Sequence, residues 1–228
     1  MSRDARKNTD YFNKYLEYQN KRIQQFQEKV SALNDDSQTR KLNIYLSSFL
    51  RDKFYASYSN GVGIDELKSI YMDWLSAIEK SNTVLYSDLI DLTSLFILLE
   101  PNKNDVVRIT QLIKNSKDKD DLLIMFLNEW LTDRKTKIFT GEIKYDEYKN
   151  LSDAITETVN INKSSHLIRF ISKDWYTANN KSSWYDSHKN DKETYVGYWC
   201  FIGAALAKIF LISKENFDGV DYFPTDLL

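Results

Sequence analysis

Few residues in this sequence have the types and spacing that catalysis or metal binding requires. His166 and His188 are far apart, no HExxH motif occurs, and Cys200 is the single cysteine, so no zinc site is expected. The segment 142–144 (Glu-Ile-Lys) matches the Glu-x-Lys spacing of restriction-type nucleases, which hold Mg²⁺ and a water on a strand beside an upstream aspartate. Here the flanks indicate loop and helix, and the upstream candidate Asp133 lies in a helical pattern. We interpret the match as coincidental.

Two acidic groups could also bind metal ions. Asp118, Asp120 and Asp121 resemble part of a calcium loop but lack its central glycine and closing glutamate, and charge at the start of a helix explains them more simply. Asp88 and Asp91 are one helical turn apart, yet diphosphate chemistry needs a second aspartate-rich face. No P-loop, GxGxxG or GxSxG motif occurs. The sequence therefore predicts no catalytic residue, no metal site and no cofactor.

The remaining unusual segment indicates recognition. Residues 175–195, WYTANNKSSWYDSHKNDKETY, alternate aromatic pairs with charged and amide side chains, which is the composition of a binding surface. Trp175 and Trp184 are expected to fill the core at a helix–loop junction. Tyr176 and Tyr185 are expected to reach solvent, because a tyrosine hydroxyl needs water or a partner.

The elements that position these residues are predicted to be helices. Gly (6) and Pro (2) are scarce among the 228 residues, where average usage would give roughly 27 together. Turn-rich β-sandwiches and glycine-dependent phosphate loops need many such residues and are therefore disfavoured. The hydrophobic content of 42% is enough for a core and too high for a disordered chain. We predict an all-α protein of about eight to ten helices.

Apolar residues at helical spacing predict where these helices lie. The last, 195–212, is hydrophobic nearly all round, which indicates a central buried helix or a membrane span. It contains Lys208 and is at the short limit for crossing a bilayer, so we expect a buried helix. The charged stretch near residue 117 predicts an N-terminal helical half, 1–117, and a C-terminal half, 118–228, packed as one unit. The expected helices cover about 4–34, 38–58, 67–78, 85–99, 106–114, 123–133, 148–155, 161–178 and 195–212.

Charge and cysteine content restrict the partners and the compartment. The net charge of −2 lacks the basic footprint of a nucleic-acid binder, so direct contact with nucleic acid is not expected. One cysteine cannot form an internal disulfide and suits a reducing compartment. The first residues, MSRDARKNTD, contain no apolar signal segment. We expect a cytoplasmic protein that does not contact a membrane.

The C-terminal part of the sequence has a distinctive set of residues around an alanine-rich helix: Trp184, His188, Tyr195, Gly197, Tyr198, Trp199, Tyr222, Pro224 and Asp226. With this set it resembles PoNi-type immunity proteins, which protect bacteria against polymorphic nuclease toxins delivered into neighbouring cells. Residues 55–71, YASYSNGVGIDELKSIY, are similar to an N-terminal segment of the same family. The resemblance implies an all-α fold and a role in neutralising a toxin.

Two positions depart from the family pattern. Ile202 stands where the family has a glutamate, and Ser57 stands where it has an arginine. Loss of both members of one ion pair would explain this, because losing a buried pair costs less than stranding one charge.

The implied role predicts a binding surface without chemistry. A nuclease presents a basic groove to DNA, so an inhibitor that covers it needs acidic and aromatic groups. An all-α enzyme with an unrecognised site and a helical protein-interaction adaptor are the alternatives. The expected partner is a cognate toxin, a DNase, and the candidate binding residues are Tyr176, Tyr185, Asp186, Asp191, Glu193, Asp218 and Asp221.

Overall fold

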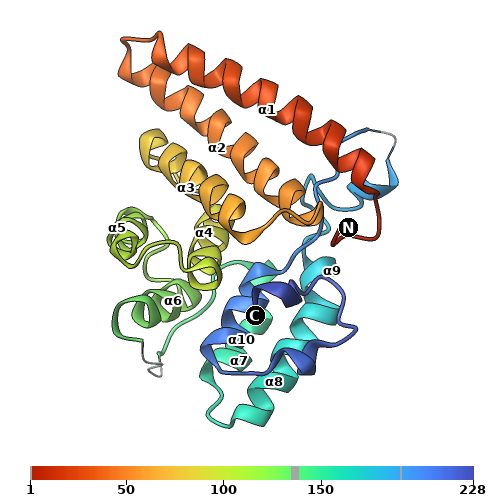
Figure 1. The fold of residues 1–228 in the computed structure, drawn as a ribbon. Helices are drawn as coiled ribbons and strands as arrows, with labels where there is room; N and C mark the ends of the chain where they lie inside the picture. The colour runs from red at the N-terminus through yellow and green to blue at the C-terminus, as the bar shows by residue number, and fades with distance from the viewer. Residues whose placement is uncertain (1, 135–138, 191) are drawn as a thin grey trace. The chain divides into compact units, whose positions relative to one another are not determined.

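The computed structural model describes residues 2–134, 139–190 and 192–228, and these residues form helices, turns and loops without a strand. The predicted all-α fold is confirmed (Figure 1). In the described part of the chain, five short 3₁₀ helices and one π-helix, η3, lie between or after the α-helices. The α-helices are α1 (Thr9–Ser31), α2 (Asp36–Ser59), α3 (Ile64–Ser81), α4 (Tyr86–Leu99), α5 (Val106–Asn115), α6 (Leu122–Asp133), α7 (Ser152–Thr156), α8 (Asn160–Arg169), α9 (Tyr176–Ala178) and α10 (Phe201–Ile209). The others are η1 (Lys103–Asp105), η2 (Asp146–Leu151), η3 (Phe170–Trp175), η4 (Ser187–Lys189), η5 (Lys214–Phe217) and η6 (Thr225–Leu227).

Short polar side chains begin several of these helices. The side chain of Asn8 accepts a hydrogen bond from the Tyr11 N–H at 2.9 Å, and Asp35 accepts one from the Gln38 N–H at 2.7 Å. Asp121 caps α6 by accepting from two backbone N–H groups of its first turn. These bonds satisfy donors that have no partner inside the helix. The interpretation of Asp121 as a helix-start residue is thereby confirmed.

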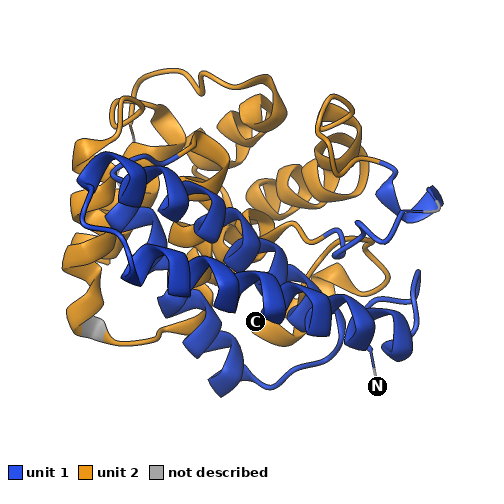
Figure 2. Ribbon diagram, turned by 90° about the horizontal axis from the view of Figure 1, so that it is seen from above, with its two compact units in different colours: residues 1–84, 186–198 blue, residues 85–185, 199–228 orange. Residues whose placement is uncertain are grey.

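The chain divides into two compact units (Figure 2). Residues 1–84 and 186–198 form the first, and residues 85–185 and 199–228 form the second. The chain passes from one unit to the other at three places, because the units are defined by spatial contacts. The expected boundary at 117/118 was instead based on composition along the sequence. The charged stretch around 117 lies inside the second unit. The boundary at 117/118 stays a prediction about sequence modules.

The first unit is built on α1, α2 and α3. Helix α2 packs against both α1 and α3, and the three run side by side in Figure 1. The rings of Phe54 and Trp74 lie 6.3 Å apart between α2 and α3, and both side chains are fully buried. The segment 186–198 joins this unit from far along the sequence: the Ser59 hydroxyl donates to the Val196 carbonyl at 2.7 Å.

The second unit is centred on α4 and α10, which pack against each other. Helix α4 is buried on nearly every side, and eight of the nine residues of α10 are buried. The prediction of a buried helix near the C-terminus is therefore confirmed. Gly203 makes the close packing possible, because a Cβ there would lie 2.7 Å from Cδ1 of Ile171.

The predicted helix over 195–212 is wrong in its extent. Residues 195–200 are not helical, and α10 covers Phe201–Ile209 alone. Gly197 has φ +112°, which a right-handed helix cannot contain. The backbone N–H of Cys200 donates to the Tyr222 carbonyl at 2.8 Å rather than to a helical partner. Hydrophobicity alone could not separate a largely buried non-helical segment from the buried helix that follows it.

The region predicted as one helix over 161–178 is also divided. Helix α8 passes into the π-helix η3 and then into the single turn α9. A π-helical segment widens the turn and rotates the side chains that follow it, and such segments often occur at functional sites. Within the described residues, no helix is long and apolar enough to cross a membrane.

Candidate functional site

Five aromatic side chains of the second unit form a continuous cluster, which we call the aromatic stack. The ring of Tyr176 lies 5.0 Å from Tyr222 with an interplanar angle of 6°, and 4.5 Å from Tyr185 with an angle of 29°. Trp175 stacks on Trp184 at 5.5 Å and 24°. Trp175 is buried, whereas the other four rings are half-buried. The cluster therefore combines a fixed base with a partly accessible face, as the anchor of a protein interface does.

Backbone geometry holds the stack in place. Trp175 is the last residue of η3 and Tyr176 is the first residue of α9, and the Asn179 side-chain amide donates to the Trp175 carbonyl at 2.8 Å. Tyr222 has φ +68°, in the left-handed region that a tyrosine rarely adopts. This conformation, together with the bond from the Cys200 N–H, fixes the ring of Tyr222 beside Tyr176.

Two of the predicted acidic residues also belong to the second unit. Asp221 is exposed and directly precedes Tyr222 of the aromatic stack. Asp218 is exposed and follows η5. The second unit therefore contains Tyr176, Tyr185, Asp218 and Asp221 of the predicted set, and the two tyrosines are in ring contact.

The other predicted acidic residues belong to the first unit. Asp186 is half-buried, has φ +56°, and is bound by the ammonium of Lys189 at 2.9 Å. Glu193 is exposed. Asp191 lies outside the described residues. The predicted set is thus distributed over both units.

Residues of the family motif in segment 186–198 are joined by hydrogen bonds. The Tyr198 hydroxyl lies 2.9 Å from Nδ1 of His188 and accepts from the His188 backbone N–H at 3.1 Å. The Tyr195 hydroxyl donates to the carboxylate of Asp4, which is buried and also accepts from the Arg6 N–H at 2.7 Å. Tyr195 and Tyr198 are themselves buried, with ring centroids 4.8 Å apart. This motif binds the segment to the N-terminus of the chain.

The environment of this network changes the titration of two groups. Burial raises the pKa of the Tyr195 hydroxyl, and the charge of Asp4 adds to the effect. Burial also lowers the pKa of His188, assisted by the nearby positive charge of Arg6. Both groups are therefore held in their neutral forms, which suits a structural network. Sequence analysis missed Asp4, because an aspartate in a polar N-terminal segment has no pattern that indicates burial.

The remaining motif residues have structural positions. Trp199 is half-buried, Pro224 is buried and precedes η6, and Asp226 is exposed within η6. The two departures from the family pattern are both buried: Ile202 in α10 is 1% exposed and Ser57 in α2 is 2% exposed. An uncompensated charge at either position would be costly. That these positions once formed one ion pair stays a prediction.

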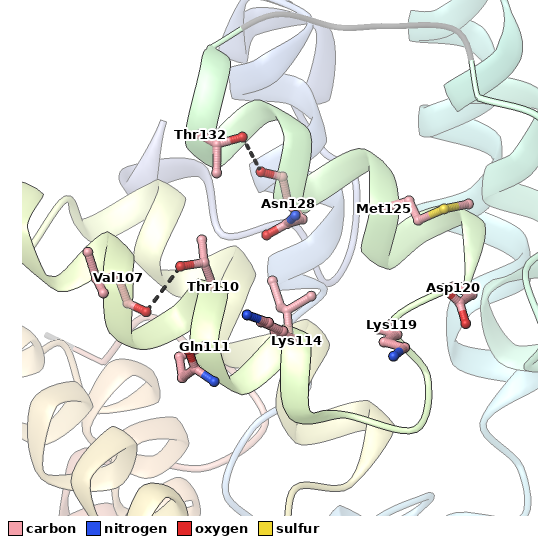
Figure 3. A pocket seen from close by; sticks show the side chains of 10 residues that line it. Val107, Thr110, Gln111, Lys114, Lys119, Asp120, Met125, Asn128 and Thr132 are labelled. Atoms are coloured by element: carbon pink, nitrogen blue, oxygen red, sulfur yellow. Dashed lines mark hydrogen bonds between the residues drawn. The ribbon is translucent and has the colours of Figure 1, made fainter.

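A groove of about 430 Å³ lies between α5 and α6 in the second unit (Figure 3). Figure 3 shows Thr110 and Lys114 on α5, Asn128 on α6, and Lys119 in the loop that connects these helices. Its lining includes one carboxylate, that of Asp120, together with the ammonium groups of Lys114 and Lys119. Among the described residues, no three His, Cys, Asp or Glu side chains are grouped so that they could hold a metal ion.

Comparison with known proteins gives a consistent assignment. A search of curated proteins and a search of solved structures each returned no match. Two family models do match: the N-terminal model of the PoNe immunity proteins matches residues 3–111, and the C-terminal model matches residues 119–227. The two matches follow one another and cover nearly the whole sequence, including the buried motif of Tyr195 and Tyr198. The chain therefore belongs to the family of PoNe immunity proteins (PoNi).

Proposed function

We propose that this protein neutralises its cognate nuclease toxin by binding it directly and covering the surface that holds DNA. Membership in the PoNe immunity family is the observation that carries the proposal. We further propose that the toxin is a DNase and that the encounter takes place in the cytoplasm. Exclusion of DNA needs shape and charge complementarity and no chemistry from the inhibitor.

The aromatic stack supports a role as anchor in this complex. Interface hot spots are enriched in Trp and Tyr that are partly preorganised and become fully desolvated on binding. Four of its rings are half-buried, so a partner can cover the remaining surface. Because contacts within the cluster already restrict the rings, little side-chain entropy is lost when they are covered. We assign this anchoring role to Tyr176 and Tyr185.

Exposed carboxylates support electrostatic attraction to a basic toxin surface. Glu193 in the first unit and Asp218 and Asp221 in the second are all exposed. Asp186 is compensated by Lys189 and has a smaller net effect. We therefore assign the main attraction for the toxin to Glu193, Asp218 and Asp221. Asp186 and Asp191 remain candidate toxin-binding residues.

Co-expression with the toxin tests the function itself. Cells that express the cognate toxin alone should degrade their DNA, whereas cells that also express this chain should grow, and the two proteins should co-purify. A catalytically inactive toxin should co-purify equally well, because the proposal needs binding and no turnover. Failure of both rescue and co-purification would overturn the proposed function.

A further inference from the structure

A groove of about 410 Å³ lies on α1 in the first unit. We call it the α1 groove. It shares no lining residue with the groove between α5 and α6, and none of its lining residues belongs to the aromatic stack. Its lining residues are Tyr15, Tyr18, Arg22, Asp52, Glu193 and Thr194.

One face of α1 supplies the wall of this groove. Tyr11, Tyr15, Tyr18 and Arg22 follow one another at steps of four, three and four, so their side chains lie in one row. Tyr15 is 6% exposed and forms the floor, whereas Tyr18 is 58% exposed and forms the rim. The row of tyrosines is thus partly covered by the protein and partly left to solvent.

Tyr11 positions the segment that forms the opposite wall of the α1 groove. Its hydroxyl accepts from the Tyr195 N–H at 2.9 Å and donates to the Tyr195 carbonyl at 3.0 Å. These two bonds hold the backbone of segment 193–195 against α1, one turn before Tyr15. Glu193 and Thr194 therefore line the groove although they are far from α1 in sequence.

Two carboxylates and one guanidinium give the groove its charge. The guanidinium of Arg22 lies over the Phe49 ring at 3.8 Å and on one side of the Tyr18 ring at 5.3 Å, and its Nη1 donates to Oε1 of Gln19 at 3.1 Å. Asp52 is half-exposed and accepts from the Arg51 guanidinium at 3.2 Å. Glu193 is exposed. Burial raises the pKa of the Tyr15 hydroxyl and the charge of Asp52 raises it further, whereas the charges of Arg22 and Arg51 lower it.

We propose that the α1 groove receives an arginine or lysine side chain that projects from the toxin. The inference rests on the proposed function, because a surface that binds DNA carries many such side chains. An aromatic ring at the rim and carboxylates in the walls are the groups that recognise a cationic side chain, through cation–π and charge-assisted hydrogen bonds.

Substitutions in the groove test this inference with the purified full chain and its cognate toxin. Glu193→Gln keeps the size of the side chain and removes its charge, and Tyr18→Ala removes the rim. Each should weaken the Kd for the toxin by about tenfold or more, as loss of a charged or aromatic contact at an interface does. Both side chains are exposed, so thermal unfolding should be unchanged.

Tyr45→Ala is the matched control. Tyr45 is also an exposed tyrosine of the first unit, at 56%, but it lies on α2 outside the groove lining. Its removal should change the Kd by less than about threefold, within the range of neutral surface substitutions. If Glu193→Gln and Tyr18→Ala bind as tightly as Tyr45→Ala, the groove inference is overturned while the proposed function stands.

A tetra-arginine peptide separates the two proposals when the toxin itself does not bind. Titrated against the isotope-labelled chain, it should shift NMR signals of Tyr15, Tyr18 and Glu193, and Glu193→Gln should reduce those shifts. Failure of the toxin to bind together with these shifts would overturn the proposed function and keep the groove as a site for basic side chains. Absence of both toxin binding and peptide shifts would overturn both.

Discussion

Tyr11 and Tyr195 are joined by two hydrogen bonds through a single hydroxyl, which accepts from the Tyr195 N–H and donates to the Tyr195 carbonyl. The two residues are 184 positions apart in sequence. The Tyr195 side chain makes a third bond, to the buried carboxylate of Asp4. The segment that carries Glu193 is therefore positioned by α1 and by the N-terminus of the chain.

Tyr11→Phe should lower the free energy of unfolding by about 1–3 kcal/mol. The substitution removes the hydroxyl that is the hydrogen-bond partner of both the N–H and the carbonyl of Tyr195. Denaturant unfolding monitored by circular dichroism measures the change. Tyr18→Phe is the matched control, since Tyr18 is largely exposed and its loss should cost under about 0.5 kcal/mol. Equal stability of the two variants would contradict the structural role of the Tyr11 hydroxyl.

Gly203→Ala should destabilise the protein by about 1–3 kcal/mol through overpacking. The added Cβ would lie 2.7 Å from Cδ1 and 2.8 Å from Cγ1 of Ile171. Because Ile171→Ala removes both atoms, Gly203→Ala should cost much less in that background, and thermal unfolding of all four proteins forms a double-mutant cycle. Additive effects would show that Gly203 and Ile171 are not in contact.

Stability should decrease as the pH rises above about 10, the ordinary pKa of tyrosine. Burial raises the pKa values of Tyr15, Tyr86 and Tyr195 in the folded protein, and nearby carboxylates add to the effect. Above pH 10 the unfolded chain therefore loses protons that the folded chain retains, which favours unfolding. Absorbance at 295 nm should detect a group of tyrosines that ionise only when the helical signal is lost. Reversible ionisation of all 15 tyrosines in the folded protein would contradict this.

Tyr176→Ala should raise the dissociation rate of the toxin by about tenfold and change the association rate little, because desolvated anchors act mainly on dissociation. The variant opens the middle of the aromatic stack, between Tyr185 and Tyr222. Tyr176→Phe retains the ring and should bind nearly as the native protein does. Stopped-flow or surface plasmon resonance kinetics distinguish the two. An unchanged dissociation rate for Tyr176→Ala would exclude the stack as the anchor.

The association rate should fall clearly between ~50 mM and ~500 mM ionic strength, because salt screens attraction between the acidic inhibitor surface and a basic toxin. Reversal of Asp218 and Asp221 to lysine should lower the rate at low salt and flatten its salt dependence. Reversal of Asp65 and Glu66, exposed residues at the start of α3, provides a control. A rate independent of salt would remove electrostatic steering from the proposal.

Periodicity and capping residues determined most of the helices without any tertiary information. The apolar spacing along α1, α2 and α4 predicted those helices, because a helix that packs on one face needs apolar residues every three or four positions. Asp121 could be recognised as a helix-start residue, because this role depends on adjacent residues alone.

Only the tertiary structure decided what the C-terminal aromatic residues do. Residues 195–200 are mostly apolar or aromatic and run directly into α10, so composition predicted a single helix, whereas hydrogen bonds of Tyr195 to Tyr11 and Asp4 hold a non-helical segment. The pairing of Tyr176 with Tyr222 likewise depends on a π-helical turn and a left-handed backbone that no local pattern predicts. Both arrangements join residues distant in sequence, and their energies come from contacts that exist only once the chain has folded.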